Sequence, residues 1–521
     1  MQIVLSAVKF LCNIAFKLIK FFGLLPLLIC VFAVLFVPAE WQDSALFNAL
    51  YMVLIYAMMF LAAALTLRNV IRFKNPGFCW MPLIMEKIGK KKSIGFQAKN
   101  TSVTSADLRG MFFGAKNGKY VVKPEEEDGH ALIIGGAGSG KTTNIGVNTL
   151  QIWKGRLFAL DLKPELYDKC KEVRGEENIL VLDPTDPNSC GYDPLYILRE
   201  STNPAQAAMN IAASIIPLSP DVKEPMWIEN AQAILAAALI YYKDMSFAAI
   251  IRNVRMRTPK DLIEEMYNGD NDLAKMLVSS LQGASEQTLG SIASELAGKI
   301  TIFATDTELI STLDNSRYHI LKPYELEEKD VFLKIPEHNL KIWSPFVTLI
   351  LNQFLESFER RPNDINQTPI LFMLDEFPRL GKVPSIQDGL ATLRSKKIEI
   401  MLFVQSKSQL DAIYGQDKTK SIVDNCTWKA VLKATEPETQ RWLSDMVGTY
   451  DANKKSQNFN QNDMGITSGS GISKTTEEKR IIKPEEFAYL DKQLVLLSPN
   501  GYDIIDKVPY YADANFWSER S

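Results

Sequence analysis

One glycine-rich stretch has the residue types and the spacing needed to hold the phosphates of a nucleotide. It contains a glycine, four residues of any type and then Gly-Lys-Thr, which fills the phosphate-loop pattern. Glycines let backbone N–H groups converge on phosphate oxygens, because no Cβ stands in the way. The residues expected to bind ATP are Gly135, Gly136, Ala137, Gly138, Ser139, Gly140, Lys141, Thr142 and Thr143. The alternative is a glycine-rich turn that binds nothing.

Two side chains of this loop have defined tasks in such a site. Lys141 is expected to reach the β- and γ-phosphates, and the hydroxyl of Thr142 to bind Mg²⁺. An apolar run at residues 131–135, typical of a buried strand, precedes the loop, and a helix is expected to follow it. This order of strand, loop and helix is the one that phosphate binding requires.

Two carboxylates follow directly after a second apolar run. Residues 369–374 are Pro-Ile-Leu-Phe-Met-Leu, and Asp375 and Glu376 follow directly. We expect Asp375 to belong to the Mg²⁺ shell and Glu376 to orient and deprotonate the attacking water. Gln405 comes just after the strand predicted at residues 399–403 and is a candidate sensor of the γ-phosphate. The alternatives are that Asp375 and Glu376 only begin a helix, and that Gln405 is an ordinary polar residue at the end of a strand.

Further short strands are needed to position these groups. Residues 157–160 and 179–182 are apolar, and each run is followed by an aspartate, Asp161 or Asp183. Alternating strands and helices indicate a parallel sheet that presents its ligand groups at the carboxyl ends of the strands. Asp161 and Lys163 therefore lie near the edge of the site, where they either sense the nucleotide or cap the following helix.

Between residues 203 and 318 the strand signal disappears, and the apolar spacing predicts an all-helical insert. The predicted elements beyond it are a strand at 331–335, helices near 345–360 and at 385–397, a mobile loop or hairpin at 451–476, and a last strand at 494–498 that closes the sheet.

Two uncharged segments near the N-terminus, residues 21–37 and 45–67, are long enough to cross a membrane. The connection at residues 38–44 carries two carboxylates, whereas basic residues flank the pair on its outer ends: Lys9, Lys17, Lys20, Arg68, Arg72 and Lys74. This asymmetry predicts a transmembrane hairpin with both ends in the cytoplasm. Two buried core helices are the alternative.

The bulk composition narrows the function classes. A net charge of −3 over 521 residues means that any contact with DNA must come from local basic patches. The six cysteines include no C-x-x-C pair, and the three histidines have no ligand spacing. These spacings argue against a histidine–cysteine metal site and against a disulfide scaffold, and favour reduced thiols in the cytosol.

Several short sequence motifs occur together in one known family. They are the loop itself, Asp161-Leu-Lys-Pro-Glu-Leu166, Tyr192-Asp-Pro-Leu195, Leu374-Asp-Glu-Phe-Pro378, Val404-Gln-Ser-Lys-Ser-Gln-Leu410 and Tyr414-Gly415. Behind two predicted spans, this set resembles the type IV coupling proteins, also called conjugative coupling ATPases. The resemblance implies a RecA-like P-loop NTPase domain with an inserted all-α domain, working as a hexameric ring on the inner membrane of a bacterium.

The resemblance also implies roles for particular residues. Arg394 matches the family's arginine finger, which enters the active site of a neighbouring subunit; a surface arginine in an ion pair is the alternative. Two departures stand out. The loop at 38–44 is much shorter than in many members, and the sequence ends soon after Tyr510 and Tyr511 without a long acidic tail.

The division that follows is a transmembrane hairpin at 1–74, a linker and β lead-in at 75–130, a RecA-like domain at 131–202 and 319–521, and an all-α domain at 203–318. The predicted function is an inner-membrane ATPase that recruits DNA–relaxase complexes or effector proteins and delivers them to a type IV secretion channel. An FtsK/HerA-like DNA pump, and a membrane receptor that uses nucleotide only as an assembly switch, are the alternatives. Whether the cargo is DNA or protein stays open, and non-specific DNA binding is expected.

Overall fold

The computed structural model describes residues 108–163, 165–218, 222–364, 366–461 and 467–512. These residues all belong to one compact unit, Ile94–Ser521. The two predicted membrane spans lie outside the described residues. Within the described ranges, no helix has both the length and the apolar character needed to cross a bilayer.

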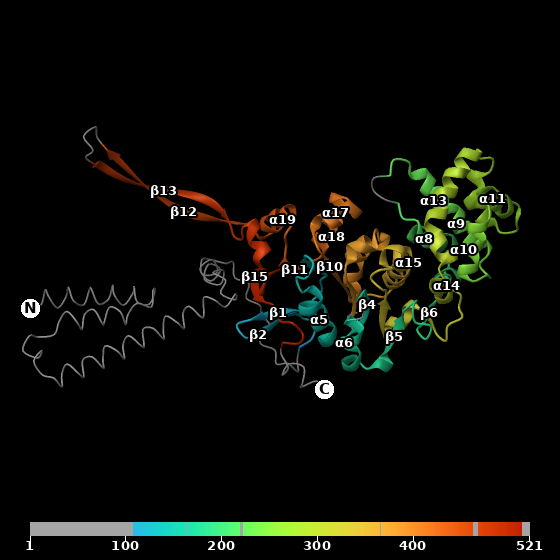
Figure 1. Cartoon of the computed structure of the whole chain (residues 1–521), viewed down its shortest axis with the longest axis horizontal. Coiled ribbons are helices and arrows are strands. Elements are labelled where there is room, and N and C mark those ends of the chain that lie inside the picture. Colours follow the sequence, from blue (N-terminus) through green and yellow to red (C-terminus); the bar gives the residue numbers. More distant parts are fainter. Residues whose placement is uncertain (1–107, 164, 219–221, 365, 462–466, 513–521) are drawn as a thin grey trace, which may run out of the picture. The chain divides into compact units, whose positions relative to one another are not determined.

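A single sheet of 11 strands organises the unit, in the order β2-β1-β15-β14-β11-β3-β10-β9-β4-β8-β5 (Figure 1). The strands are β1 (Met111–Lys116), β2 (Lys119–Lys123), β3 (Ala131–Gly135), β4 (Arg156–Asp161), β5 (Ile179–Leu182), β8 (Asp330–Lys334), β9 (Ile370–Leu374), β10 (Ile398–Val404), β11 (Trp428–Lys433), β14 (Gln493–Ser498) and β15 (Gly501–Asp506). From β11 to β5 all neighbours are parallel, whereas β14, β15, β1 and β2 pair antiparallel.

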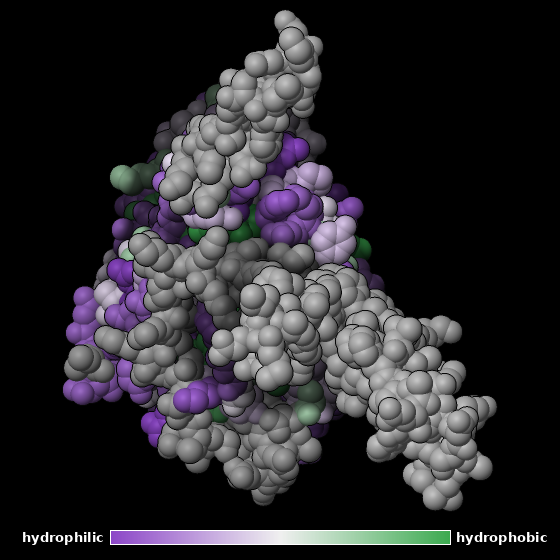
Figure 2. Space-filling view, turned by 90° about the vertical axis from the view of Figure 1, so that its left-hand side faces the viewer, coloured by the Kyte–Doolittle hydropathy of each residue, from purple (hydrophilic) through white to green (hydrophobic). Residues whose placement is uncertain are grey.

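The parallel strands are apolar because both faces of the sheet are covered. Every residue of β9 and β10 is buried. Along β3 the side chains alternate between two separate apolar clusters: Leu132 and Ile134 belong to one, and Ala131 and Ile133 to the other. Near-continuous apolar runs are what a parallel sheet between two layers of helices requires. On the face seen in Figure 2, the described surface is mainly hydrophilic.

The predicted end of the sheet is wrong. The strand expected at 494–498 is present as β14, but it does not close the sheet, because β15 pairs with it and β1 and β2 continue beyond β15. The alternating pattern Gly-Tyr-Asp-Ile-Ile-Asp of β15 is short and half polar, as suits a strand with one open face. The edge strand on this side is therefore β2.

Most helices outside the all-helical region follow one of the parallel strands. They and the helical turns beside them are η3 (Thr142–Gly146), α5 (Val147–Ile152), α6 (Glu165–Arg174), α15 (Leu340–Glu359), α16 (Pro384–Thr392), η8 (Leu393–Lys396), α17 (Lys407–Tyr414), α18 (Gln416–Asn425) and α19 (Pro437–Val447). α15 begins earlier than the predicted helix and contains Pro345 near its start. The helix expected at 385–397 tightens into η8 after Thr392 and ends at Lys397, whose φ of 56° is left-handed.

The predicted all-helical region is observed between β6 (Gly191–Tyr192) and β7 (Ile320–Leu321). Its helices are α7 (Tyr196–Glu200), α8 (Pro204–Ile215), α9 (Pro225–Tyr241), α10 (Phe247–Met256), α11 (Pro259–Asn268), α12 (Asp272–Val278), α13 (Glu286–Thr305) and α14 (Thr307–Leu313) (Figure 1). Side chains of Ser246, Thr258 and Ser285 cap the first turns of α10, α11 and α13. The described part of 451–476 belongs to a hairpin of β12 (Thr449–Gln461) and β13 (Thr467–Arg480), one of the two predicted forms.

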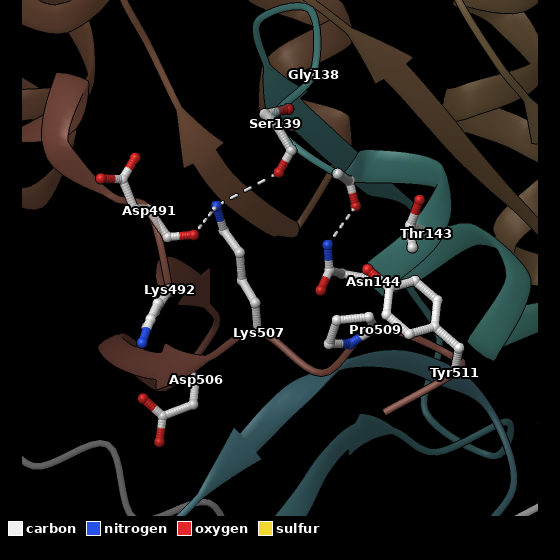
Figure 3. A pocket seen from close by; sticks show the side chains of 11 residues that line it. Gly138, Ser139, Thr143, Asn144, Asp491, Lys492, Asp506, Lys507, Pro509 and Tyr511 are labelled. Carbon is white, nitrogen blue, oxygen red and sulfur yellow. Dashed lines mark hydrogen bonds between the residues drawn. The ribbon is translucent and has the colours of Figure 1, made fainter. Parts of the chain in front are cut away.

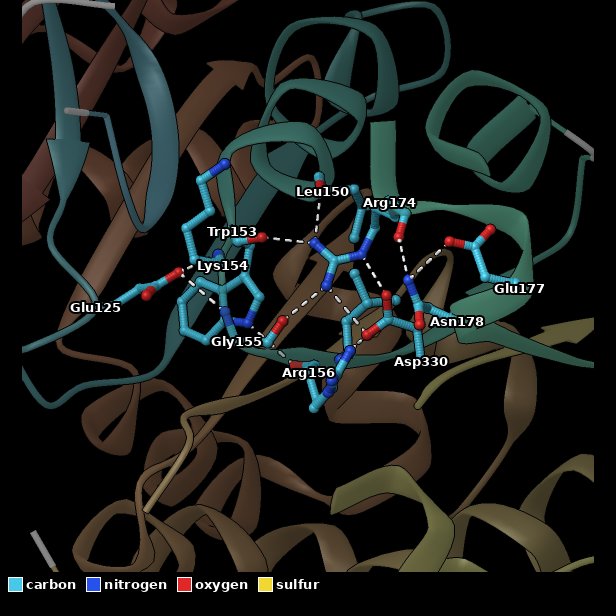
Figure 4. A network of polar contacts seen from close by, with 11 residues as sticks. Glu125, Leu150, Trp153, Lys154, Gly155, Arg156, Arg174, Glu177, Asn178 and Asp330 are labelled. Carbon is cyan, nitrogen blue, oxygen red and sulfur yellow. Dashed lines mark hydrogen bonds and ion pairs between the residues drawn. The ribbon is translucent and has the colours of Figure 1, made fainter. Parts of the chain in front are cut away.

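A buried polar network fixes the helix that follows the nucleotide loop (Figure 4). Arg174, at the end of α6, forms an ion pair with Asp330 of β8 and donates to the carbonyl oxygens of Leu150 and Gly155 at 3.2 and 2.7 Å. Asp330 also accepts from the backbone N–H of Leu157 at 3.1 Å. One guanidinium thus satisfies carbonyls at the end of α5 and joins α5, α6 and β8, which holds α5 behind the loop.

Candidate nucleotide site

The glycine-rich loop leaves the carboxyl end of β3 and leads into η3 and α5. Gly138 and Gly140 have φ of 71° and 83°, a left-handed backbone that favours glycine. A Cβ at Gly140 would collide with the side chain of Asn144, which lies one turn into the helix. The tight path of the loop therefore depends on the glycines that mark it in the sequence.

Lys141 is only 6% exposed, and its ammonium lies at the centre of the site. Its Nζ donates to the carbonyl oxygen of Gly135 at 2.7 Å and lies 3.6 Å from Oε1 of Glu376. The charge is thus held between the loop and the end of β9, where it faces the position expected for the β- and γ-phosphates.

The two carboxylates at the end of β9 differ in environment. Asp375 is 7% exposed, and the Thr142 hydroxyl donates to its Oδ2 at 3.4 Å. Burial, and to a smaller extent the neighbouring Glu376, raise the pKa of Asp375 to about 6. Glu376 has a φ of 47°, a left-handed conformation that is uncommon outside glycine. Strained backbone of this kind clusters at functional sites, and here it turns Glu376 out of the strand.

Gln405 follows β10 and contacts the second carboxylate. Its Nε2 donates to Oε2 of Glu376 at 2.8 Å. The strand register explains this contact, because Leu402 of β10 is aligned with Leu374 of β9 and Val404 with Ile134 of β3. The structure therefore brings Gln405 together with the lysine, threonine and carboxylates that the sequence pattern selected.

Arg394 does not join this group. It lies on η8, just before β10, whereas Gln405 lies just after that strand. A strand of this length spans about 20 Å at ~3.3 Å per residue, so the arginine and the site of its own chain are at opposite edges of the sheet. The Arg394 side chain is exposed, and among the contacts of the described residues it has no ion-pair partner. The surface ion pair considered as an alternative is thus not found there.

Asp161 and Lys163 lie after β4, where the sequence allows either a nucleotide sensor or a helix cap. Oδ2 of Asp161 accepts from the backbone N–H of Tyr167 at 2.9 Å, which caps the start of α6. Asp161 is 2% exposed, and burial raises its pKa to about 7. Lys163 is exposed. The capping role is therefore present for Asp161.

Sequence reasoning missed the other wall of the site. A pocket of about 600 Å³ lies beside the loop and is lined by Gly138, Ser139, Gly140, Thr143, Asn144, Asp491, Lys492, Asp506, Lys507, Pro509 and Tyr511 (Figure 3). Six of these residues come from the end of β15 or from the segments next to β14 and β15. The pattern Lys-Val-Pro-Tyr-Tyr after residue 506 is the only local signal, and nothing in it points to a loop more than three hundred residues earlier.

The family model described as "Type IV secretory system Conjugative DNA transfer" matches residues 84–521. The chain belongs to that family, the type IV coupling proteins. The resemblance carried by the sequence motifs is thereby confirmed.

This coupling protein is similar to curated relatives from several bacteria. Protein VirD4 of Agrobacterium fabrum (strain C58 / ATCC 33970) is 24% identical over 432 residues, which cover 78% of this chain and 63% of the relative. The type IV secretion system-coupling protein VirD4 of Bartonella quintana (strain Toulouse) is 23% identical, with 71% and 60% covered. The chain thus spans less than two thirds of the length of these relatives.

Solved structures of the coupling protein TrwB have a similar fold. The unbound TrwBdeltaN70 matches with a TM-score of 0.58 and 16% identity, covering 76% of this chain and 88% of that one. TrwB in complex with ADP and Mg²⁺ matches with a TM-score of 0.57 and 17% identity, covering 74% and 86%. These matches confirm the predicted α/β P-loop NTPase fold. The sheet is mixed, however, and not parallel throughout as predicted, because β14, β15, β1 and β2 pair antiparallel.

Proposed function

We propose that this chain hydrolyses ATP at the carboxyl edge of its sheet and uses the nucleotide cycle to deliver cargo to a type IV secretion channel. The observation that carries the proposal is that Glu376 lies 3.6 Å from Lys141 and accepts from Gln405 at 2.8 Å, although the three residues follow three different strands, β9, β3 and β10. A receptor that only binds nucleotide needs the lysine. It does not need a carboxylate turned out of its strand and oriented by an amide.

The proposed roles follow from these contacts. The ammonium of Lys141 exchanges its contact with Gly135 for the oxygens of the β- and γ-phosphates. Glu376 accepts a proton from the attacking water, and the amide of Gln405 keeps the carboxylate oriented and lies where it can sense the γ-phosphate. A base held by a second group in this way needs little rearrangement during the reaction.

A magnesium ion fits the donors beside this base. The Thr142 hydroxyl and the Asp375 carboxylate offer oxygens 3.4 Å apart, the hard ligands that Mg²⁺ prefers. When bound, Mg²⁺ would neutralise charge that develops on the phosphoryl group. TrwB has been solved with ADP and Mg²⁺, and its likeness to this chain supports the assignment.

The proposed assembly is a homo-hexameric ring on the inner membrane of a bacterium. Residues 21–37 and 45–67 anchor it, and the nucleotide domain lies in the cytoplasm. The cargo is a relaxase–DNA complex or an effector protein, and non-specific contacts with DNA assist its capture. Arg394 serves the site of the neighbouring subunit, because it lies at the edge of the sheet opposite to its own site.

Replacing the loop lysine tests the function. In cells that carry the secretion system, Lys141→Ala should abolish cargo transfer and leave the amount of protein in the membrane fraction unchanged, because the spans and the loop are separate elements. Lys119→Ala, which removes an exposed lysine of β2, is the matched control and should transfer normally. Normal transfer by Lys141→Ala would refute the proposal.

A further inference from the structure

The pocket beside the nucleotide loop lies on the side of β3 away from the catalytic groups. Glu376 and Gln405 follow β9 and β10, which lie on one side of β3 in the sheet. The pocket residues Asp491 and Lys507 flank the β14–β15 pair on the other side, beyond β11. Because Lys141 marks the γ-phosphate end next to Glu376, a triphosphate that follows the loop has its other end at this pocket.

We infer that the segment Asp506–Tyr511 forms the nucleoside half of the nucleotide site, with the Tyr511 ring against the base and Lys507 as a positioning residue for the loop. The inference rests on the proposed function and names the residues that bind the part of the substrate that the phosphate-loop pattern does not address.

Several hydrogen bonds fix this segment to the loop and its helix. The backbone N–H of Tyr510 donates to the carbonyl oxygen of Thr143 at 3.1 Å, and Nδ2 of Asn148 donates to that of Val508 at 2.8 Å. Lys507 Nζ donates to the carbonyl oxygen of Ser139 at 3.4 Å. The segment is therefore part of the wall of the site, and a change in Lys507 acts directly on the loop.

The lining of the pocket suits a base and a ribose. The Tyr511 ring lies next to Pro509 and faces the start of the helix after the loop (Figure 3), and 70% of Tyr511 is exposed. An exposed aromatic face stacks on any base, because every base has a π-face. The carboxylates of Asp491 and Asp506 lie on the opposite wall, where they can accept from ribose hydroxyls. The volume of about 600 Å³ is of the size that small ligands occupy.

A buried polar atom in the wall also points to a ligand. Asn144 lines the pocket and is 7% exposed; its Nδ2 donates to the carbonyl oxygen of Gly140 at 2.8 Å. Its Oδ1 has no hydrogen-bond partner among the described residues. Buried amide oxygens are normally satisfied, so a donor of the bound nucleoside is the partner this site offers.

The test separates the nucleoside from the phosphates. With the detergent-solubilised full chain, we would measure KM and kcat for ATP and GTP, and the inhibition constant of tripolyphosphate, which has no nucleoside. Tyr511→Ala should raise KM for both nucleotides about tenfold, as expected for the loss of one stacked base, with tripolyphosphate inhibition unchanged. Tyr511→Phe, which keeps the ring, should restore KM.

Two further variants make the outcome decisive. Tyr318→Ala removes an equally exposed tyrosine, 76% exposed, that does not line the pocket, and should have no effect. Lys507→Met should weaken ATP and tripolyphosphate together, because it displaces the loop. An unchanged KM in Tyr511→Ala, or an equal loss of tripolyphosphate binding, would overturn the inference. If Lys141→Ala lost nucleotide binding while Tyr511→Ala had no effect, the inference would be wrong, but the proposed function would still stand.

Discussion

The charged residues near the two ends of β10 differ in their surroundings: those at one end face an open site, and those at the other form a buried ion pair. At the carboxyl end, Gln405 contacts Glu376, and the carboxylate faces Lys141 in a site that remains open to a ligand. At the amino end, Lys123 and Glu399 form an ion pair at 2.6 Å in which both residues are almost fully buried. Close to that buried pair, Arg394 is exposed and has no ion-pair partner among the described residues.

The difference separates charges that serve stability from charges that serve binding. The Lys123–Glu399 pair and His130 are buried at the amino end of β10, and the turn η8 with Arg394 comes directly before this strand. His130 accepts from the N–H of Ile400 at 3.0 Å, so its other nitrogen carries the proton and donates to the carbonyl oxygen of Leu390 at 2.9 Å. One end of the strand is thus a site within one chain. The other end combines a buried ion pair with an exposed arginine that has no ion-pair partner in the described part of the chain.

The largest expected effect of a single change at the carboxyl end is on turnover. Glu376→Gln removes the base but keeps Lys141 and the loop, so kcat should fall by about 10²–10⁴-fold while nucleotide affinity is retained. Steady-state hydrolysis and equilibrium binding of a fluorescent ATP analogue measure the two quantities. Wild-type turnover would remove Glu376 from its role.

The matching change at the amino end should affect folding. Glu399→Gln leaves the Lys123 ammonium buried without its partner, so the free energy of unfolding should fall by about 3–5 kcal/mol. Urea unfolding followed by tryptophan fluorescence measures it. The double variant Lys123→Met/Glu399→Leu, which leaves no buried charge, should recover most of this loss. If Glu399→Gln were as stable as the wild type, the buried pair would not contribute to the stability of the fold.

A smaller effect concerns pH. Burial lowers the pKa of His130 from 6.5 to about 4. Between these values the unfolded chain binds a proton that the folded chain does not, so unfolding becomes easier as the pH falls, at about 1.4 kcal/mol per unit. His130→Gln should reduce the slope of stability between pH 6.5 and pH 4. His338→Gln, which changes an exposed histidine, should keep the wild-type slope. Equal slopes in both variants would contradict the assignment.

How much could be predicted depended on how local each signal is. The loop at 135–143 and the pair Asp375 and Glu376 are short motifs behind apolar strands, and the parallel register brings them together with Gln405. β15 did have a local signal, because only Pro499 and Asn500 separate it from β14 and Asn-Gly is typical of a hairpin turn; this signal was not used, and the sheet was predicted to end at β14. The contact of Lys507 with Ser139 joins segments more than three hundred residues apart and leaves no local pattern, so the second wall of the site was missed.

The most direct test of the account mixes two inactive proteins. Arg394→Ala keeps its own Lys141 and Glu376, and Lys141→Ala keeps its arginine, so each variant alone should lose about 10³–10⁵-fold in hydrolysis or all of it. Mixed during assembly, they should recover a fraction of wild-type activity, because some interfaces pair an intact loop with an intact arginine. Arg441→Ala, a change at another exposed arginine, is the control and should be active alone. Wild-type hydrolysis by Arg394→Ala, or no recovery on mixing, would contradict a site completed by the neighbouring subunit.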